Sequence, residues 1–281
     1  GAMDLEIDFR AMQLQVSHPS FEHANQAPVV APEMALHLDH WSHVVRVNQL
    51  VLAARMEEAR SDWERAGLLG KVWRLLKLML RTRSLDGWKI ASALTERGNN
   101  VSVHPTAVVE FCVLHDGCEI GPHAVVRGSV VGAGAVIDSH AVVNASVLGM
   151  GARVGRFGHV NLCTLFPKAM VSSGDGFQMC AFGRESFVAW GATILDLSFG
   201  QTIKVEQNGA GSELVDSGVH FLGSAIGDRA RIGHGVKIGY GVAIPSDALL
   251  VDDADFLRTW GDGPVGEATV VRNGRAVAKK D

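Results

Sequence analysis

A repeat with a step of seventeen residues is the feature that most constrains the fold of this chain. Val125 begins the segment VVRGSVVG and Val142 begins VVNASVLG, and related segments begin at Val108 and His159. Equivalent positions hold the same kind of side chain in all four segments, so each repeat adds the same structural unit to the one before it. Such a chain is expected to form a solenoid of stacked units.

Aliphatic residues divide each repeat into three parts. From Ile120 onward they follow at steps of six, five and six residues, which together make seventeen. A short strand at each step, with a small or polar residue at the corner, describes a coil with a triangular cross-section. The three aliphatic columns contain Val109, Val126, Val143 and Val160; Leu114, Val131, Leu148 and Leu165; and Ile120, Ile137 and Val154. A column of small residues runs between the first two and contains Cys112, Ser129, Ser146 and Cys163.

An antiparallel meander is the alternative architecture. It requires hairpin turns and alternation of apolar and polar residues, whereas the aliphatic residues here recur about every six positions without such turns. After an interruption, the six-residue step returns at Ile226, Ile232, Ile238 and Ile244. We therefore predict a coil that is interrupted once and then resumes.

This pattern divides the chain into consecutive parts. We expect a tag remnant at residues 1–3, a helical segment at 4–100, the first part of the coil at 101–166, an excursion at 167–218, the resumed coil at 219–255 and a tail at 256–281. The excursion and the tail are each expected to contain a hairpin, turning at 208–209 and 273–274, because both turns have the sequence Asn-Gly. Long excursions of this kind often carry function.

Three helices are expected before the coil, at about 32–67, 68–83 and 85–96. The second is amphipathic, with an apolar side opposite a basic stripe of Lys71, Arg74, Lys77 and Arg81. Two interpretations are open: the helix caps the first coil turn, which we favour, or residues 68–83 make a weak contact with an anionic membrane surface.

Composition narrows the possible partners and the compartment. A formal net charge of −4 argues against a dedicated nucleic-acid-binding protein, so we expect no nucleic-acid partner. The four cysteines contain no CxxC pair, which suits buried thiols in a reducing compartment, and we expect the chain to be cytoplasmic.

The columns and the six-residue steps resemble the hexapeptide-repeat transferase family. This resemblance implies a mainly β fold: a left-handed parallel β-helix with an N-terminal helical segment and one long excursion, assembled as a homotrimer. It also implies an acyltransferase that acts on a small sugar substrate, a nucleotide sugar or amino sugar. The donor would be a coenzyme A thioester used as cosubstrate, with no tightly bound cofactor.

Candidate catalytic residues follow from the same resemblance. His220 lies in SGVHFLGSAIGDRARIGHG, which resembles the acetyltransferase half of the bifunctional N-acetylglucosamine-1-phosphate uridyltransferase and glucosamine-1-phosphate acetyltransferase, where a histidine precedes a similar segment. His220 would be the general base. His159 with nearby Asn161 is the second candidate pair.

Two other classes share this coil. The repeat also resembles the β-helices of sugar nucleotidyltransferases, which assemble or regulate the enzyme without catalysis, and any nucleotidyl transfer would then belong to sequence upstream. The γ-type carbonic anhydrases use a GHxxxxH pattern, but Gly239 replaces the second histidine in IGHGVKIG, so we predict no metal site. His123 and His140 fall in one column and are expected to stack at a corner without a catalytic role.

Overall fold

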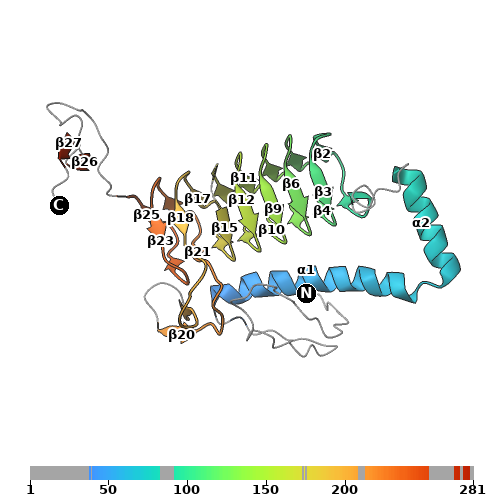
Figure 1. The fold of residues 1–281 in the computed structure, drawn as a ribbon, viewed down its shortest axis with the longest axis horizontal. Coiled ribbons are helices and arrows are strands. Elements are labelled where there is room, and N and C mark those ends of the chain that lie inside the picture. The colour runs from blue at the N-terminus through green and yellow to red at the C-terminus, as the bar shows by residue number, and fades with distance from the viewer. Residues whose placement is uncertain are drawn as a thin grey trace.

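In the computed structural model, short strands form an elongated coil with a long helix along one side (Figure 1). The structure describes residues 38, 40–82, 92–172, 174, 176–207, 213–252, 269–272 and 275–278. The expected tag remnant at residues 1–3 and the start of the first expected helix lie outside the described residues.

Parallel strands of two or three residues build three faces. The first face contains eight strands, in the spatial order β1 (Glu96–Arg97), β4 (Val113–Leu114), β7 (Val130–Val131), β10 (Val147–Leu148), β13 (Thr164–Leu165), β16 (Ala181–Phe182), β21 (Ala225–Ile226) and β24 (Ala243–Ile244). The second face also contains eight, in the order β2 (Ser102–Val103), β5 (Glu119–Ile120), β8 (Val136–Ile137), β11 (Arg153–Val154), β14 (Met170–Val171), β17 (Phe187–Val188), β22 (Arg231–Ile232) and β25 (Leu249–Leu250).

The third face completes the triangle. Its strands are β3 (Val108–Glu110), β6 (Val125–Arg127), β9 (Val142–Asn144), β12 (His159–Asn161) and β15 (Gly176–Gln178), followed by the pair β18 (Thr193–Ile194) and β23 (Lys237–Ile238). The predicted mainly β fold, a parallel β-helix with an N-terminal helical segment and one excursion, is confirmed.

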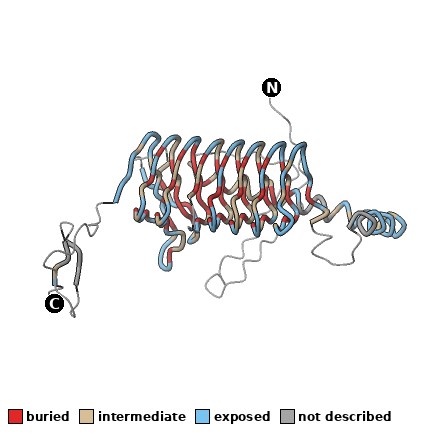
Figure 2. Tube along the Cα trace, turned by 90° about the horizontal axis from the view of Figure 1, so that it is seen from above, coloured by how far each residue is buried: buried red, intermediate tan, exposed pale blue. Residues whose placement is uncertain are grey.

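Successive turns stack in the register that the repeat predicts. Val126 is paired with Val109 on one side and with Val143 on the other, each seventeen residues away. All three predicted aliphatic columns point inward and are fully buried. Figure 2 shows buried segments recurring along the whole coil. The core is therefore a continuous apolar column, in which each side chain packs on its equivalents in the neighbouring turns.

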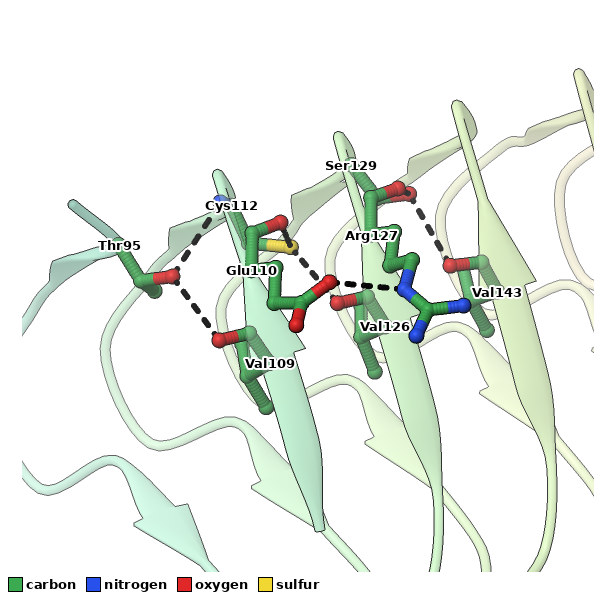
Figure 3. Close-up of polar contacts among 8 residues, drawn as sticks. All are labelled: Thr95, Val109, Glu110, Cys112, Val126, Arg127, Ser129 and Val143. Carbon is green, nitrogen blue, oxygen red and sulfur yellow. Dashed lines mark hydrogen bonds and ion pairs between the residues drawn. The ribbon is translucent and has the colours of Figure 1, made fainter. Parts of the chain in front are cut away.

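Hydroxyl and thiol groups form a second internal column at the corner between the third and first faces. The Ser129 hydroxyl donates to the Arg127 carbonyl oxygen (2.7 Å) and accepts from the Ser146 amide (3.1 Å). Figure 3 shows the first turns, where Thr95, Cys112 and Ser129 occupy equivalent positions. These bonds satisfy backbone groups that would otherwise be buried without partners. The predicted column of small residues is confirmed, and the structure extends it by Thr95, Cys180 and Ser224.

The excursion starts later than predicted. The prediction for 167–218 is wrong at both ends, because strands β14 to β18 continue the coil as far as Ile194 and the resumed coil, predicted for 219–255, begins only with β21 (Ala225–Ile226). Phe177 and Phe182 occupy aliphatic columns there, with ring centroids 5.5 Å apart in an edge-to-face arrangement, and this change of residue type hides the repeat. The excursion therefore comprises residues 195–224, between β18 and β21.

Both predicted hairpins are present. Strands β19 (Lys204–Glu206) and β20 (Leu214–Asp216) pair antiparallel in the excursion, and β26 (Thr269–Arg272) and β27 (Arg275–Ala278) do so in the tail. Their predicted turns, 208–209 and 273–274, lie outside the described residues.

Helix α1 (Trp41–Arg65) lies along the first face (Figure 1). Val45 is fully buried in a small cluster with residues of both the coil and the excursion. The Asn48 side chain donates to the Thr164 hydroxyl (2.8 Å), and the Arg46 guanidinium donates to the Ser217 carbonyl oxygen (2.9 Å). Helix α1 thus fixes the excursion to the coil.

Helix α2 (Leu68–Thr82) lies beyond the first-turn end of the coil and apart from its strands (Figure 1). The interpretation of this helix as a cap on the first coil turn is wrong, because its apolar residues Leu68, Leu69 and Trp73 are exposed. Most of the third expected helix, at 85–96, falls outside the described residues, and β1 occupies its last position, so the coil begins before residue 101.

Candidate functional site

His220 lies on the segment of the excursion that returns to the coil, and its side chain is exposed. Its carbonyl oxygen accepts a hydrogen bond from the Ser198 amide (2.8 Å), and Leu197 and Phe221 form an antiparallel bridge beside it. These contacts fix the backbone around His220 and leave the imidazole open to solvent.

A carboxylate lies near His220. Asp216, at the end of β20, accepts hydrogen bonds from the Gly218 amide (2.8 Å) and the Thr202 hydroxyl (2.7 Å). These bonds lower the pKa of Asp216, and the charges of Lys204 and His220 lower it further. Asp216 is therefore ionised at neutral pH, and its negative charge interacts electrostatically with His220. We call His220, Asp216, Thr202 and Lys204 the excursion site.

Asp196 and Gln178 lie where the excursion leaves the third face. Burial raises the pKa of Asp196, and a hydrogen bond from the Gln178 side chain opposes this shift. The Asp196 carbonyl oxygen accepts a hydrogen bond from the amide of Leu222, two residues after His220 (2.8 Å). The start of the excursion is thus bonded to the segment that carries His220.

A strip of polar side chains runs along the third face toward the excursion. It occupies the last residue of each three-residue strand: Glu110, Arg127, Asn144, Asn161 and Gln178. Arg127 Nε donates to Glu110 Oε2 (2.8 Å), as Figure 3 shows, and Asn161 Nδ2 donates to Gln178 Oε1 (2.9 Å). Through Gln178 this strip reaches Asp196, so polar groups follow the coil to the root of the excursion.

The second predicted pair lies on the third face. His159 and Asn161 both belong to β12 and point outward, because residues two apart in a strand share a side. His159 is exposed, while the Asn161 amide is occupied by its bond to Gln178. None of the described contacts joins His159 to His220, so the structure does not bring the two candidate histidines together.

The cysteines are buried and form no disulfide. Burial raises the pKa of Cys112 and that of Cys118, each to about 11. Burial also raises the pKa of Cys180, and the neighbouring Cys163 thiol adds to the shift. These groups are protonated thiols at neutral pH, which makes them poor nucleophiles. The prediction of buried thiols is confirmed.

Other histidines stack on the coil. His123 and His140 have ring centroids 4.9 Å apart, which confirms the predicted stacking, and Phe157 continues the row at 4.9 Å. His234 packs on Trp190 with ring centroids 5.1 Å apart and hydrogen bonds to its carbonyl oxygen. Within the described part of the chain, no group of three or more His, Cys, Asp or Glu side chains is arranged to hold a metal ion.

Several residues of this region were not predicted from the sequence, among them Gln178, Asp216 and Asp196. Gln178 lies seventeen residues after Asn161, so following the repeat for one more turn would identify it. Asp216 precedes His220 by four residues, a spacing that becomes informative once the hairpin is known to end there. Asp196 carries no comparable signal, because its environment depends on Gln178 and the returning segment.

Part of the coil is similar to a known protein family. Residues 94–176 match a family model described as the GMPPB C-terminal domain. One similar solved structure is titled as a crystallographic analysis of the polysialic acid O-acetyltransferase OatWY. It is 16% identical, with a TM-score of 0.21, and the match covers 66% of this chain and 92% of that one. No curated protein matches the chain. Residues 94–176 are therefore similar to the GMPPB C-terminal domain, a left-handed β-helix of the hexapeptide type from sugar nucleotidyltransferases.

Proposed function

We propose that the chain is a hexapeptide-type acyltransferase that transfers an acyl group from a coenzyme A thioester to a nucleotide sugar or amino sugar. The observation that carries the proposal is the excursion site, where the charge of exposed His220 interacts with the ionised carboxylate of Asp216. A histidine with an anionic neighbour suits general base catalysis near neutral pH.

The proposed reaction requires one proton relay. His220 accepts the proton of the acceptor hydroxyl or amine as the acceptor oxygen or nitrogen attacks the thioester carbonyl carbon. The carbon–sulfur bond then breaks, and the leaving thiolate takes the proton back from the imidazolium. The Asp216 carboxylate would stabilise the imidazolium between these steps, as an acidic partner does in other histidine-based sites.

A trimer is part of this proposal. Helix α1 covers the first face, so neighbouring subunits would pack against the second or third face. The four free, buried thiols support a reducing, cytoplasmic location.

Kinetics with matched histidine variants test the proposal. Release of free coenzyme A from acetyl-coenzyme A is measured with a panel of nucleotide sugars and amino sugars. His220→Ala should lower kcat/KM by about 10²- to 10⁴-fold, the usual contribution of a general base. Asp216→Asn should lower it less. His115→Ala removes an exposed coil histidine outside the site and should leave activity unchanged. Equal rates for wild type and His220→Ala would refute the assignment.

A second function is supported by the match of residues 94–176 to the GMPPB C-terminal domain. On this alternative, the coil is a non-catalytic domain that assembles or regulates a sugar nucleotidyltransferase-like protein as a trimer. It predicts a trimer in light scattering, with no coenzyme A binding and no acyl transfer.

A further inference from the structure

Helix α2 exposes a large apolar surface. Leu68 is 80% exposed, Leu69 87% and Trp73 67%, although these residue types usually lie in protein cores. Val72 and Leu76 enlarge the same side of the helix. A contiguous apolar patch on an otherwise polar surface marks an interaction site.

The opposite side of α2 is cationic. Lys71, Arg74 and Lys77 follow one another at three-residue steps, and at 100° per residue they lie across the helix from Leu69 and Val72. The sequence LLGKVWRLLKLMLRT contains no acidic residue, in a chain whose formal net charge is −4. Positive charge is therefore concentrated on this helix of an acidic protein.

We infer that α2 binds the surface of an anionic lipid bilayer. An amphipathic helix with a basic polar side lies in the interface plane, with its apolar side at the boundary between headgroups and acyl chains. Fifteen residues span about 22 Å along the helix axis. No described helix is long and apolar enough to cross a membrane.

Charge complementarity favours lipid over a second copy of the chain. Two α2 helices that pack through their apolar sides would cover the leucines but leave the basic side chains without anionic partners. In a bilayer that contains anionic lipid, the apolar side of α2 would contact the acyl chains while the basic side chains remain among the phosphates. Since α1 is bonded to the coil, the coil would be held beside the membrane.

Flotation of the purified full chain with lipid vesicles tests this inference. Wild-type protein should float with phosphatidylcholine vesicles that contain about one third phosphatidylserine. Binding to vesicles of phosphatidylcholine alone should be at least tenfold weaker, and added salt should reduce binding to the anionic vesicles.

Paired variants identify the surface. Lys71→Glu/Arg74→Glu/Lys77→Glu should abolish flotation, whereas Arg153→Glu/Arg231→Glu/Lys237→Glu makes the same charge change on exposed coil residues and should not. Leu69→Glu/Trp73→Glu should also abolish it, with Leu249→Glu as an exposed apolar control on the last coil turn. Circular dichroism checks that each variant is folded.

Three results would overturn the inference. One is no flotation of the wild type at low salt, and another is equal binding to neutral and anionic vesicles. The third is that the α2 variants bind vesicles like wild type and change only the oligomeric state, which would show that a second copy covers the helix.

Discussion

Replacing Gly132 by alanine tests whether the turns stack as closely as the structure indicates. A Cβ atom at this position would lie 2.6 Å from the Gly149 carbonyl carbon and 2.7 Å from the Met150 amide nitrogen in the next turn. Ordinary contact begins at 3.4 Å, so the turns would have to separate locally by about 0.8 Å (3.4 − 2.6). Overpacking of this kind destabilises by about 1–3 kcal/mol, and here the obstacle is backbone, which cannot rotate away.

Thermal unfolding measures how far Gly132→Ala destabilises the coil. For a coil of this size, about 1 kcal/mol corresponds to about 2–4 °C in Tm, so Gly132→Ala should lower Tm by about 3–10 °C. Gly176→Ala is the matched control, because a Cβ atom there meets nothing within 4 Å and its φ is also ordinary. It should leave Tm unchanged or raise it slightly, since alanine restricts the unfolded chain. Equal Tm values for the two variants would refute the close stacking at this corner.

Three further predictions concern buried polar groups. Cys112 and Cys118 should not react with a thiol reagent at pH 7.5 in the native protein but should react fully in denaturant; rapid native labelling would contradict their burial. Because burial raises the pKa of Asp196, this carboxyl contributes stability when protonated and loses it as pH rises through the folded pKa. Asp196→Asn should therefore raise Tm relative to wild type at pH 7.5, and this gain should vanish below about pH 4. A gain that does not depend on pH would contradict burial of the ionised carboxylate as its cause. Arg127→Met leaves the buried Glu110 carboxylate without its ion pair and should cost about 1–3 kcal/mol in denaturant unfolding. Adding Glu110→Gln should restore part of the lost stability. If the double variant instead loses the sum of the two single losses, the Arg127 and Glu110 side chains are not coupled.

The coil is predictable from the sequence because its core is periodic. Each inward position, such as that of Val109, Val126 and Val143, meets its own equivalents, so a pattern in the sequence maps directly onto contacts in space. The pattern was lost where Phe177 and Phe182 replaced aliphatic residues, because the columns require burial and not a particular residue type.

The candidate site is less predictable because it depends on contacts without a period. The sequence nominated His220, but the carboxylate of Asp216 that interacts with it electrostatically depends on the hairpin formed by β19 and β20. The position of α2 was also missed. Amphipathicity predicts that a helix has an apolar side, and it does not say what covers that side.

Coenzyme A binding tests the central claim most directly. Thermal unfolding of the full chain is followed with coenzyme A, acetyl-coenzyme A, UDP-sugars and sugar phosphates, for wild type and His220→Ala. An acyltransferase should be stabilised by coenzyme A by about 2.7 kcal/mol at one hundred times its Kd. His220→Ala should keep this shift, because the general base acts on the acceptor, and should lose turnover. No shift of wild type with coenzyme A or acetyl-coenzyme A would contradict the proposed acyl transfer and favour the assembly domain.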